Sequence, residues 1–289
     1  MYHKTKGYKV FNAFNIAFLC VLALLCVLPL INLFALSLSS KAAANGGLVT
    51  FWPIEFTPTA YIKTFQNNNF IRSITISLAR AVVGTIFSMF VITTSGYALS
   101  KDFRGRTIVM WLFVFTMLFG GGLIPSYIVN TSIGLKNSFW VYIFPGAFSC
   151  YNMILIMNFF RSIPKALEEA ALIDGAGFFT VFRKIYLPLS LPGLATVALF
   201  IIVGNWNDWF TGILYMSDTK NYPLASFLQV IVVQNNVQDL ALDPASAEAM
   251  SERTLKAAQV FIGALPILLV YPFLQKYFVK GIVMGAVKE

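Results

Sequence analysis

The chain has 289 residues, of which 58% are apolar and 11% are charged, whereas soluble domains carry about 25% charged residues. This composition excludes a disordered chain, a coiled coil, a collagen and a small disulfide scaffold. The net charge of +9 is spread thinly through apolar sequence and forms no basic stripe, so we expect no nucleic-acid partner. We predict an all-α membrane protein surrounded by membrane lipid.

Six long segments lack charged side chains and are rich in Leu, Ile, Val and Phe. Because a helix needs roughly 20 apolar residues to cross a bilayer core, we predict six transmembrane helices in a single domain over residues 10–289, after a tail over 1–9. The expected spans are residues 10–38, 74–99, 107–130, 137–160, 187–212 and 257–278.

The basic residues between these spans predict the orientation. One side carries 13 Lys and Arg residues and the other carries 7, so the positive-inside rule places the first side, with both termini, in the cytoplasm. Residues 161–188 then form a cytoplasmic loop and residues 213–256 an extracellular loop. Within the latter, residues 221–238 fit an extracellular helix or loop, with a re-entrant segment as the alternative.

The first apolar segment also resembles a signal peptide, because lysines precede it and small residues follow it. A signal core is about 7–15 residues long, and this segment is about twice that length. We therefore favour a retained first helix over a cleaved leader.

Residues that could perform chemistry are scarce. His3 is the single histidine, so the chain can assemble neither a histidine-based metal site nor a Ser-His-Asp triad. No G-x-x-x-x-G-K-[ST] phosphate loop occurs. We expect no catalytic residues and no bound metal in this chain.

The cytoplasmic loop contains a short helix with marked ends. Ser162 fits the N-cap and Pro164 the first turn, and Gly175 fits the left-handed position that ends a helix. A second short helix is expected over residues 178–186.

The surface of the first loop helix indicates a docking site. Ala170 and Ala171 form a small face beside the acidic Glu168 and Glu169, which suits a groove on another cytoplasmic protein. The alternative is a helix lying on the lipid surface, which would be Lys-rich with bulky apolar residues on one face.

The residues from Glu169 to Pro188 read EAA-x3-G-x9-I-x-L-P. This string resembles the EAA loop of binding-protein-dependent ABC importer permeases. Residues 119–125, 205–209 and 272–281 resemble carbohydrate-uptake permeases of the maltose type, in particular a subgroup associated with polysaccharide fragments such as pectin-derived oligosaccharides.

The resemblance implies half of a transport pore in a prokaryotic cytoplasmic membrane. Its partners would be a second homologous permease, two cytoplasmic ATPase subunits and an extracellular solute-binding protein that delivers an oligosaccharide. ATP and Mg would be bound by the ATPase, and this chain would bind no cofactor. The implied ATPase-coupling residues are Glu168, Glu169, Ala170, Ala171, Asp174, Gly175, Ala176 and Phe178.

The C-terminal tail is a second implied ATPase contact, involving Lys280, Gly281 and Gly285. The G-x-x-x-G spacing of the two glycines also occurs in packed membrane helices, which is the alternative interpretation.

Arg80 lies inside a predicted span, where ionisable residues usually face a bundle interior or a water-filled cavity. It could contact an anionic or polyhydroxylated cargo. Alternatively it snorkels, or it pairs with backbone carbonyls or with the partner permease.

A second group of candidates for the substrate path lies at the predicted extracellular end of the fifth span. Asn205, Trp206, Asp208 and Trp209 combine aromatic faces with amide and carboxylate groups that suit sugar rings, and Trp206 and Trp209 are expected to share a helix face. The alternative is an aromatic belt at the membrane interface.

Two further residues, Tyr151 and Asn152, are weaker candidates for the substrate path, and packing is the alternative role for both.

Two other classes of function compete with a permease subunit. An ion-coupled secondary transporter acting alone would need acidic residues inside its spans for the coupling ion, and the span interiors offer only Arg80. A membrane enzyme would need a catalytic set that the chain lacks.

Overall fold

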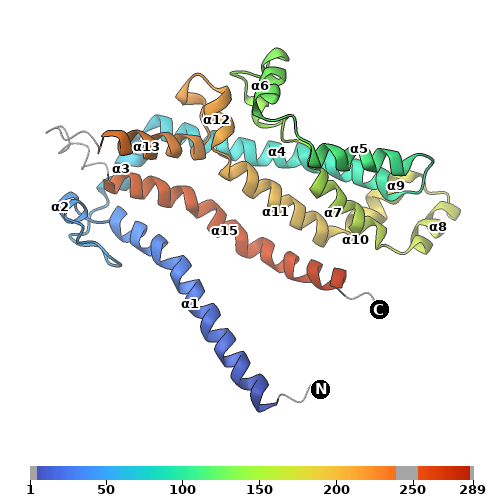
Figure 1. The fold of residues 1–289 in the computed structure, drawn as a ribbon, viewed down its shortest axis with the longest axis horizontal. Coiled ribbons are helices and arrows are strands. Elements are labelled where there is room, and N and C mark those ends of the chain that lie inside the picture. Colours follow the sequence, from blue (N-terminus) through green and yellow to red (C-terminus); the bar gives the residue numbers. More distant parts are fainter. Residues whose placement is uncertain (1–4, 239–252, 287–289) are drawn as a thin grey trace. The chain divides into compact units, whose positions relative to one another are not determined.

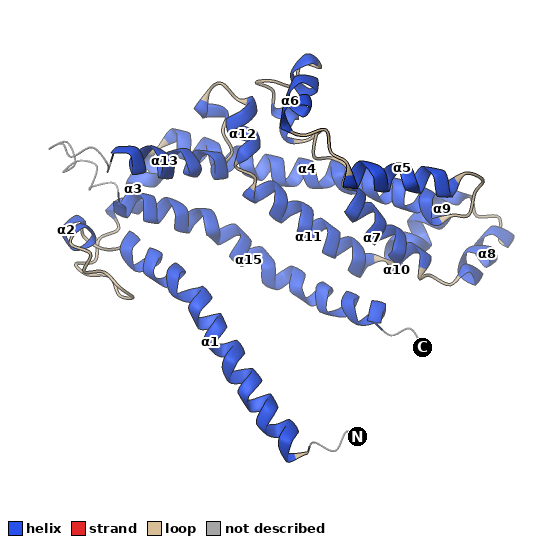
Figure 2. Ribbon diagram, in the orientation of Figure 1, coloured by secondary structure: helices blue, strands red, loops and turns tan. Residues whose placement is uncertain are grey.

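The computed structural model describes residues 5–238 and 253–286, and within these ranges all regular structure is helical (Figures 1 and 2). The α-helices are α1 (Lys6–Ser37), α2 (Lys41–Asn45), α3 (Thr59–Gln66), α4 (Asn68–Ser100), α5 (Arg106–Leu118), α6 (Leu123–Ser132), α7 (Cys150–Arg161), α8 (Lys165–Ile173), α9 (Phe178–Val181), α10 (Leu187–Leu189), α11 (Leu191–Asn207), α12 (Phe210–Tyr215), α13 (Leu224–Gln238) and α15 (Arg253–Ala286). The short 3-10 helices are η1 (Phe139–Tyr142) and η3 (Thr219–Asn221), and η2 (Phe182–Tyr186) is a π-helix.

The chain divides into two compact units, one of residues 1–70 and 228–265 and the other of residues 71–227 and 266–289. In the first unit, the end of α1 is tied to the segment that follows α2, because Asn32 Nδ2 donates to the Thr50 carbonyl at 2.7 Å. The centres of the Phe34 ring in α1 and the Phe261 ring in α15 are 4.9 Å apart. The earlier turns of α1 are apolar and exposed, as expected of a helix in lipid.

Three described helices are long and apolar enough to cross a membrane: α1, α4 and residues 253–270 of α15. Two further pairs pass the same test but are bent, by 110° between α5 and α6 and by 80° between residues 178–189 and α11. The first bend falls at Gly120–Gly122, where Gly122 has φ +83°. The second falls at Ser190, between Pro188 and Pro192.

The predicted fourth span, residues 137–160, is not one helix. Helix α7 has 12 residues, or roughly 18 Å at 1.5 Å per residue, which is shorter than a bilayer core. Residues 137–149 instead form η1 and a series of turns. Pro145 and Gly146 interrupt the segment, and Ser149 Oγ caps α7 by accepting from the Asn152 N–H at 3.3 Å.

The main core of the second unit lies between α4, α7, η2 and α11, and it includes Ile92, Met153, Phe160, Tyr186 and Val197. Helices α7 and α11 pack together, as do α5 and α7.

Gly193 permits the close approach of α7 and α11. A Cβ placed on Gly193 would lie 2.4 Å from the Phe159 ring, so no larger residue fits there without a shift.

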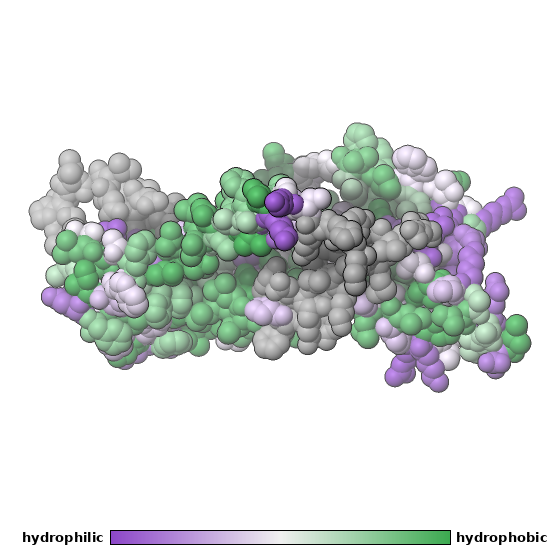
Figure 3. Space-filling model, turned by 90° about the horizontal axis from the view of Figure 1, so that it is seen from below, coloured by the Kyte–Doolittle hydropathy of each residue, from purple (hydrophilic) through white to green (hydrophobic). Residues whose placement is uncertain are grey.

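The surface is unlike that of a water-soluble protein. Helix α5 contains no buried residue, and Ile108, Trp111, Leu112 and Phe115 are all more than half exposed. Apolar side chains cover much of the face shown in Figure 3. Such a surface needs lipid or another apolar helix around it.

Candidate coupling loop and substrate path

The loop helix α8 starts later than predicted. Pro164 occupies the N-cap position, and Ser162 instead ends α7 with its Oγ donating to the Phe159 carbonyl at 2.7 Å. A serine at this position can serve either helix end, which is why the sequence pattern was misleading.

The end of α8 confirms the prediction for Gly175, which has φ +83°. The Gly175 N–H donates to the Leu172 carbonyl at 3.0 Å and the Ala176 N–H to the Ala171 carbonyl at 2.9 Å. This is the Schellman arrangement, in which the glycine satisfies the last carbonyls of the helix. It fixes the direction in which the chain leaves α8.

Helix α8 has an exposed side and a side that packs on the core. Glu169, Ala170, Asp174 and Gly175 are exposed, as is Phe178 in the next helix. Exposed apolar side chains extend this surface: Ile173 is 85% exposed and Phe179 is 74% exposed. We call the surface formed by Glu169, Ala170, Ile173, Asp174, Phe178 and Phe179 the outer face of the loop.

The remaining predicted coupling residues face the body of the protein. Ala171 and Ala176 pack against the main core. The side chain of Glu168 is 15% exposed, and its Oε2 lies 2.6 Å from Lys101 Nζ at the end of α4. Thus one turn of α8 offers Glu169 outward and anchors Glu168 inward.

Two tyrosines complete the anchor of Glu168. Tyr186 in η2 donates its hydroxyl to Glu168 Oε2 at 2.6 Å, and the Tyr97 hydroxyl of α4 donates to the Phe178 carbonyl at 3.3 Å. Lys101 Nζ also lies 3.9 Å from the centre of the Tyr186 ring and 4.6 Å from that of Tyr97. We call Tyr97, Lys101, Glu168 and Tyr186 the loop anchor.

The charge state of Glu168 follows from these contacts. Burial alone would raise the pKa of its carboxyl, but hydrogen bonds from Lys101 and Tyr186, with the charges of Lys101 and Lys165, lower that pKa below its usual value. Glu168 is therefore ionised at neutral pH and holds the anchor together. An exposed ion pair between Lys165 and Asp102, at 3.0 Å, links the same two segments.

In the predicted substrate path, the structure brings Arg80 and Asp208 together. The Arg80 guanidinium donates to the Asp208 carboxylate through Nη2 and to its carbonyl, at 3.1 Å, through Nη1. It also lies 5.0 Å from the centre of the Tyr142 ring. The side chain of Arg80 is 5% exposed and that of Asp208 is 29% exposed. These contacts favour structural pairing of Arg80, with the carboxylate of this same chain as an additional partner.

The prediction that Trp206 and Trp209 share a helix face is wrong. Helix α11 ends at Asn207, and Asp208 is extended with ψ 101°. Its carboxylate accepts from the Phe210 and Thr211 N–H groups at 3.0 and 3.2 Å, and so starts α12. Trp206 is 6% exposed and Trp209 is 42% exposed, so the two rings lie in different environments.

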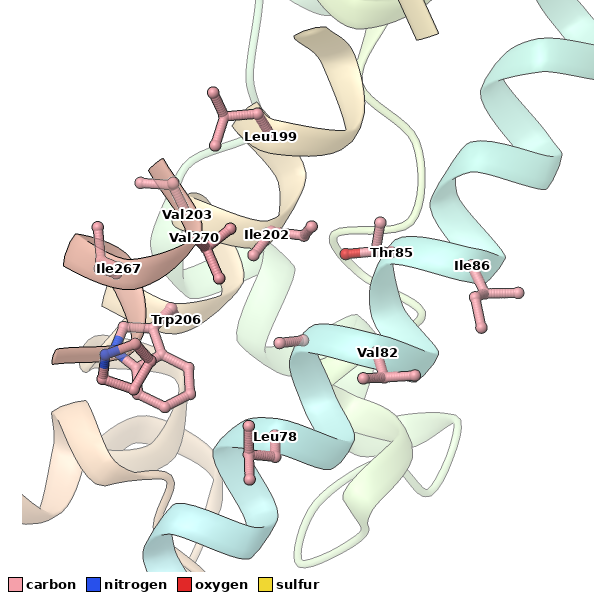
Figure 4. Close-up of a pocket in the computed structure, with 12 residues that line it drawn as sticks. Leu78, Val82, Thr85, Ile86, Leu199, Ile202, Val203, Trp206, Ile267 and Val270 are labelled. Carbon is pink, nitrogen blue, oxygen red and sulfur yellow. The ribbon is translucent and has the colours of Figure 1, made fainter. Parts of the chain in front are cut away.

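Trp206 lines an apolar cavity of about 350 Å³ between α4, α11 and residues 266–270 of α15. Its other lining side chains are aliphatic apart from Thr85 and Pro266, as Figure 4 shows for the labelled residues. Asn205 lies against α4, with Nδ2 2.7 Å from where a Cβ on Gly84 would be. A cavity with so few polar groups offers little to the hydroxyls of a sugar.

The other predicted residues are not brought to this place. Tyr151 is exposed and Asn152 is buried, both in the first turn of α7. Lys280, Gly281 and Gly285 lie in the helical backbone of α15, but their side chains are outside the described part of the structure.

An apolar helical surface, with several helices long and apolar enough to cross a bilayer, defines a polytopic membrane protein. Comparison with known proteins identifies which kind. The family of binding-protein-dependent transport system inner membrane components matches residues 103–284, which is more than half of the chain. The chain belongs to this family.

Individual relatives cover nearly the whole length. The polygalacturonan/rhamnogalacturonan transport system permease protein YtcP of Bacillus subtilis (strain 168) is 40% identical over 97% of this chain and 99% of its own. Protein LplC of the same organism is 40% identical over 99% of this chain and 97% of its own. The solved structure of a bacterial ABC transporter involved in the import of the acidic polysaccharide alginate contains a chain that is 31% identical, with a TM-score of 0.86 over 95% of this chain and 98% of that one.

Family membership decides several of the sequence predictions. The chain is a multi-pass, non-catalytic permease component of the bacterial inner membrane that works with a binding protein, and ATP is handled by a separate subunit. The ion-coupled secondary transporter and the membrane enzyme are thereby excluded.

Proposed function

We propose that this chain forms half of the translocation pore of an ATP-driven importer of acidic oligosaccharides, and that the outer face of the loop seats in the cytoplasmic ATPase. The observation that carries the coupling role is the division of α8 between an exposed outer face and the loop anchor. The cargo class is supported by relatives named for polygalacturonan and alginate import.

The proposed topology has six spans with both termini in the cytoplasm, in line with the 13 to 7 distribution of basic residues. Helices α1, α4 and α15 supply three spans, the bent pair of α5 and α6 supplies a fourth, and α11 supplies a fifth, with residues 178–186 on the cytoplasmic side. Helix α7 with residues 137–149 supplies the sixth. The irregular part of that span is tolerable because Val141, Tyr142 and Ile143 are buried within the protein rather than exposed to lipid.

The outer face is suited to a protein partner. Ile173, Phe178 and Phe179 are large apolar side chains exposed at a cytoplasmic position in the proposed topology, and a clustered apolar surface in water marks an interaction site. Glu169 and Asp174 add charges that fix the register of docking. The remaining subunits would be a second homologous permease and two ATPase subunits.

Movement of the docked loop would reach the pore through the loop anchor. Glu168 joins α8 to the end of α4 and to η2, which continues through α10 into α11. The ATPase can shift the conformational equilibrium of the pore only by the difference in free energy between its contacts with the loop in the two states. A rigid connection at Glu168 lets such a difference act on two pore helices together.

The test compares Ile173→Glu with the matched control Phe103→Glu, which places the same charge on an exposed aromatic outside the loop. We expect Ile173→Glu to abolish copurification of the ATPase and oligosaccharide import at normal membrane levels, while Phe103→Glu retains both. Normal ATPase binding by Ile173→Glu would overturn the docking role. Import by this chain alone in liposomes would overturn the half-pore.

A further inference from the structure

A second cavity, of about 250 Å³, lies beside the N-terminal part of α4 and differs in character from the apolar cavity of Figure 4. Arg72, Asn137 and Asn221 supply polar groups to its wall, and Phe139 and Tyr142 supply aromatic rings. In the proposed topology this cavity lies at the extracellular side. One cation, two amides and two rings in one pocket suit a charged sugar.

The polar groups of this cavity are held in place. Arg72 Nη2 donates to Asn221 Oδ1 at 3.0 Å, and the Tyr142 hydroxyl donates to the Asn221 carbonyl at 2.8 Å. Asn137 has a left-handed backbone with φ +60°, and its Oδ1 accepts from the Ser217 N–H at 2.7 Å. Since the Asn137 oxygen is occupied, its amide NH2 is the group left to donate to a ligand.

The charge of the cavity comes from Arg72. Arg80, eight residues further along α4, is neutralised by Asp208 behind the Tyr142 ring. Arg72 forms no ion pair with any residue in the described ranges 5–238 and 253–286. Its guanidinium is exposed and retains donors that could hold a carboxylate in a two-pronged pair.

We propose that this cavity is a subsite for one hexuronate residue of an acidic oligosaccharide, an inference that rests on the proposed function. Arg72 binds the sugar carboxylate, the Phe139 ring packs on the face of the sugar, and Asn137 and Asn221 bind its hydroxyls. The volume is just under the roughly 300–1,000 Å³ typical of pockets for larger ligands, so it accommodates one sugar residue rather than a chain.

The experiment uses the complete transporter, with the second permease and the ATPase. The reporter is Ser217→Cys, at an exposed position that follows the lining residue Met216 and whose N–H bonds to Asn137. A membrane-impermeant maleimide labels this cysteine, and trigalacturonate or its neutral methyl ester is added as a competitor. We expect millimolar trigalacturonate to slow labelling and the ester to have little effect. Arg72→Gln should raise the trigalacturonate concentration needed for protection about tenfold, which is the effect expected from the loss of one charge-assisted hydrogen bond.

Two variants control for charge and geometry. Lys220→Gln removes a positive charge next to Asn221 without altering the cavity wall, and should leave protection unchanged. Arg72→Lys keeps the charge but not the two-pronged geometry, and should give intermediate protection.

Three results would overturn the subsite: no protection by trigalacturonate, equal protection by the ester, or full protection in Arg72→Gln. Stimulation of ATP hydrolysis by the binding protein is measured on the same preparations. If that stimulation is normal while protection fails, the subsite is wrong and the proposed importer stands; if it is absent from the wild-type complex, the proposed function fails first.

Discussion

The ion pair between Arg80 and Asp208 predicts an unequal response to loss of either charge. Asp208→Asn preserves the shape of the side chain and its cap on α12, but it leaves the Arg80 guanidinium, 5% exposed, without a counter-charge. Arg80 Nε already lacks a hydrogen-bond partner within the described residues, so little else can compensate. Breaking a buried pair in this way costs about 3–5 kcal/mol.

The converse substitution should cost less. In Arg80→Met, Asp208 keeps the Phe210 and Thr211 N–H groups as donors, and its side chain reaches solvent with 29% exposure. We expect a loss of about 1–3 kcal/mol. The double variant removes both charges together, and it should cost less than the sum of the single variants because no charge is left unpaired.

The measurement is the free energy of unfolding of the purified protein, obtained by titration with a denaturing detergent. Gly204→Ala is a suitable control, because it alters α11 near the pair at a position with no neighbouring atom within 4 Å. Equal losses from Asp208→Asn and Arg80→Met, or strict additivity in the double variant, would refute the assignment of this pair as a buried, mutually dependent unit.

Three further predictions concern the loop and the core. Gly175→Ala should cost about 1–3 kcal/mol of local strain because residue 175 has φ +83°, although the added Cβ would meet no neighbouring atom. Asparagine tolerates the left-handed conformation better than alanine, so import should fall more in Gly175→Ala than in Gly175→Asn at equal membrane levels; the opposite order would count against a left-handed requirement. Glu168→Gln should lower import while ATPase copurification persists, whereas Glu169→Gln should weaken copurification. Since the pKa of Glu168 is lowered in the fold, the stability that its ionised carboxylate contributes is fully present above the ordinary carboxyl pKa of about 4.3 and is lost only as pH falls through the lower folded value. The thermal stabilities of wild type and Glu168→Gln should therefore differ by a constant amount at neutral pH and converge in acid. Gly193→Ala should destabilise the protein by about 1–3 kcal/mol through overpacking against Phe159, an effect that a smaller side chain in Phe159→Leu should relieve; no relief would place the clash elsewhere.

Local sequence signals predicted the C-terminal end of the loop helix but not its start. Gly175 ends α8 as expected because the left-handed conformation depends on the glycine itself. In the segment 221–238, which from its sequence fits either a helix or a loop, residues Leu224–Gln238 form α13. Such features depend on neighbours within a few residues, which the sequence displays directly.

Contacts between distant segments were not predictable in the same way. Glu168 was expected among the coupling residues, yet its partner Lys101 lies 67 positions away, and no periodic pattern links the two. Arg80 and Asp208 are 128 positions apart. Each residue was noticed for its chemistry, but only the packing of α4 against the later helices assigns its partner.

The errors in helix boundaries had recognisable causes. Counting charge-free residues joined 137–149 to α7 although Pro145 and Gly146 interrupt the run. The expected span 187–212 also extended α11 through Asp208, which ends the charge-free run, belongs to a residue type that commonly starts a helix, and here binds the first N–H groups of α12. Hydropathy measures affinity for the membrane and says little about where a helix is broken.

The π-helix η2 sets the rotational phase between the loop and the pore. A π-turn accommodates one residue more than an α-turn, and each residue of an α-helix turns the chain by roughly 100°. Removing a single residue from Phe182–Tyr186 would therefore return this turn to α geometry and leave the loop and α11 nearly in phase, whereas removing one residue from the α-helical part of α11 would rotate them by about that angle. In the proposed coupling, this wide turn lets the segment between the loop and α11 carry one extra residue without rotating the loop surface that meets the ATPase.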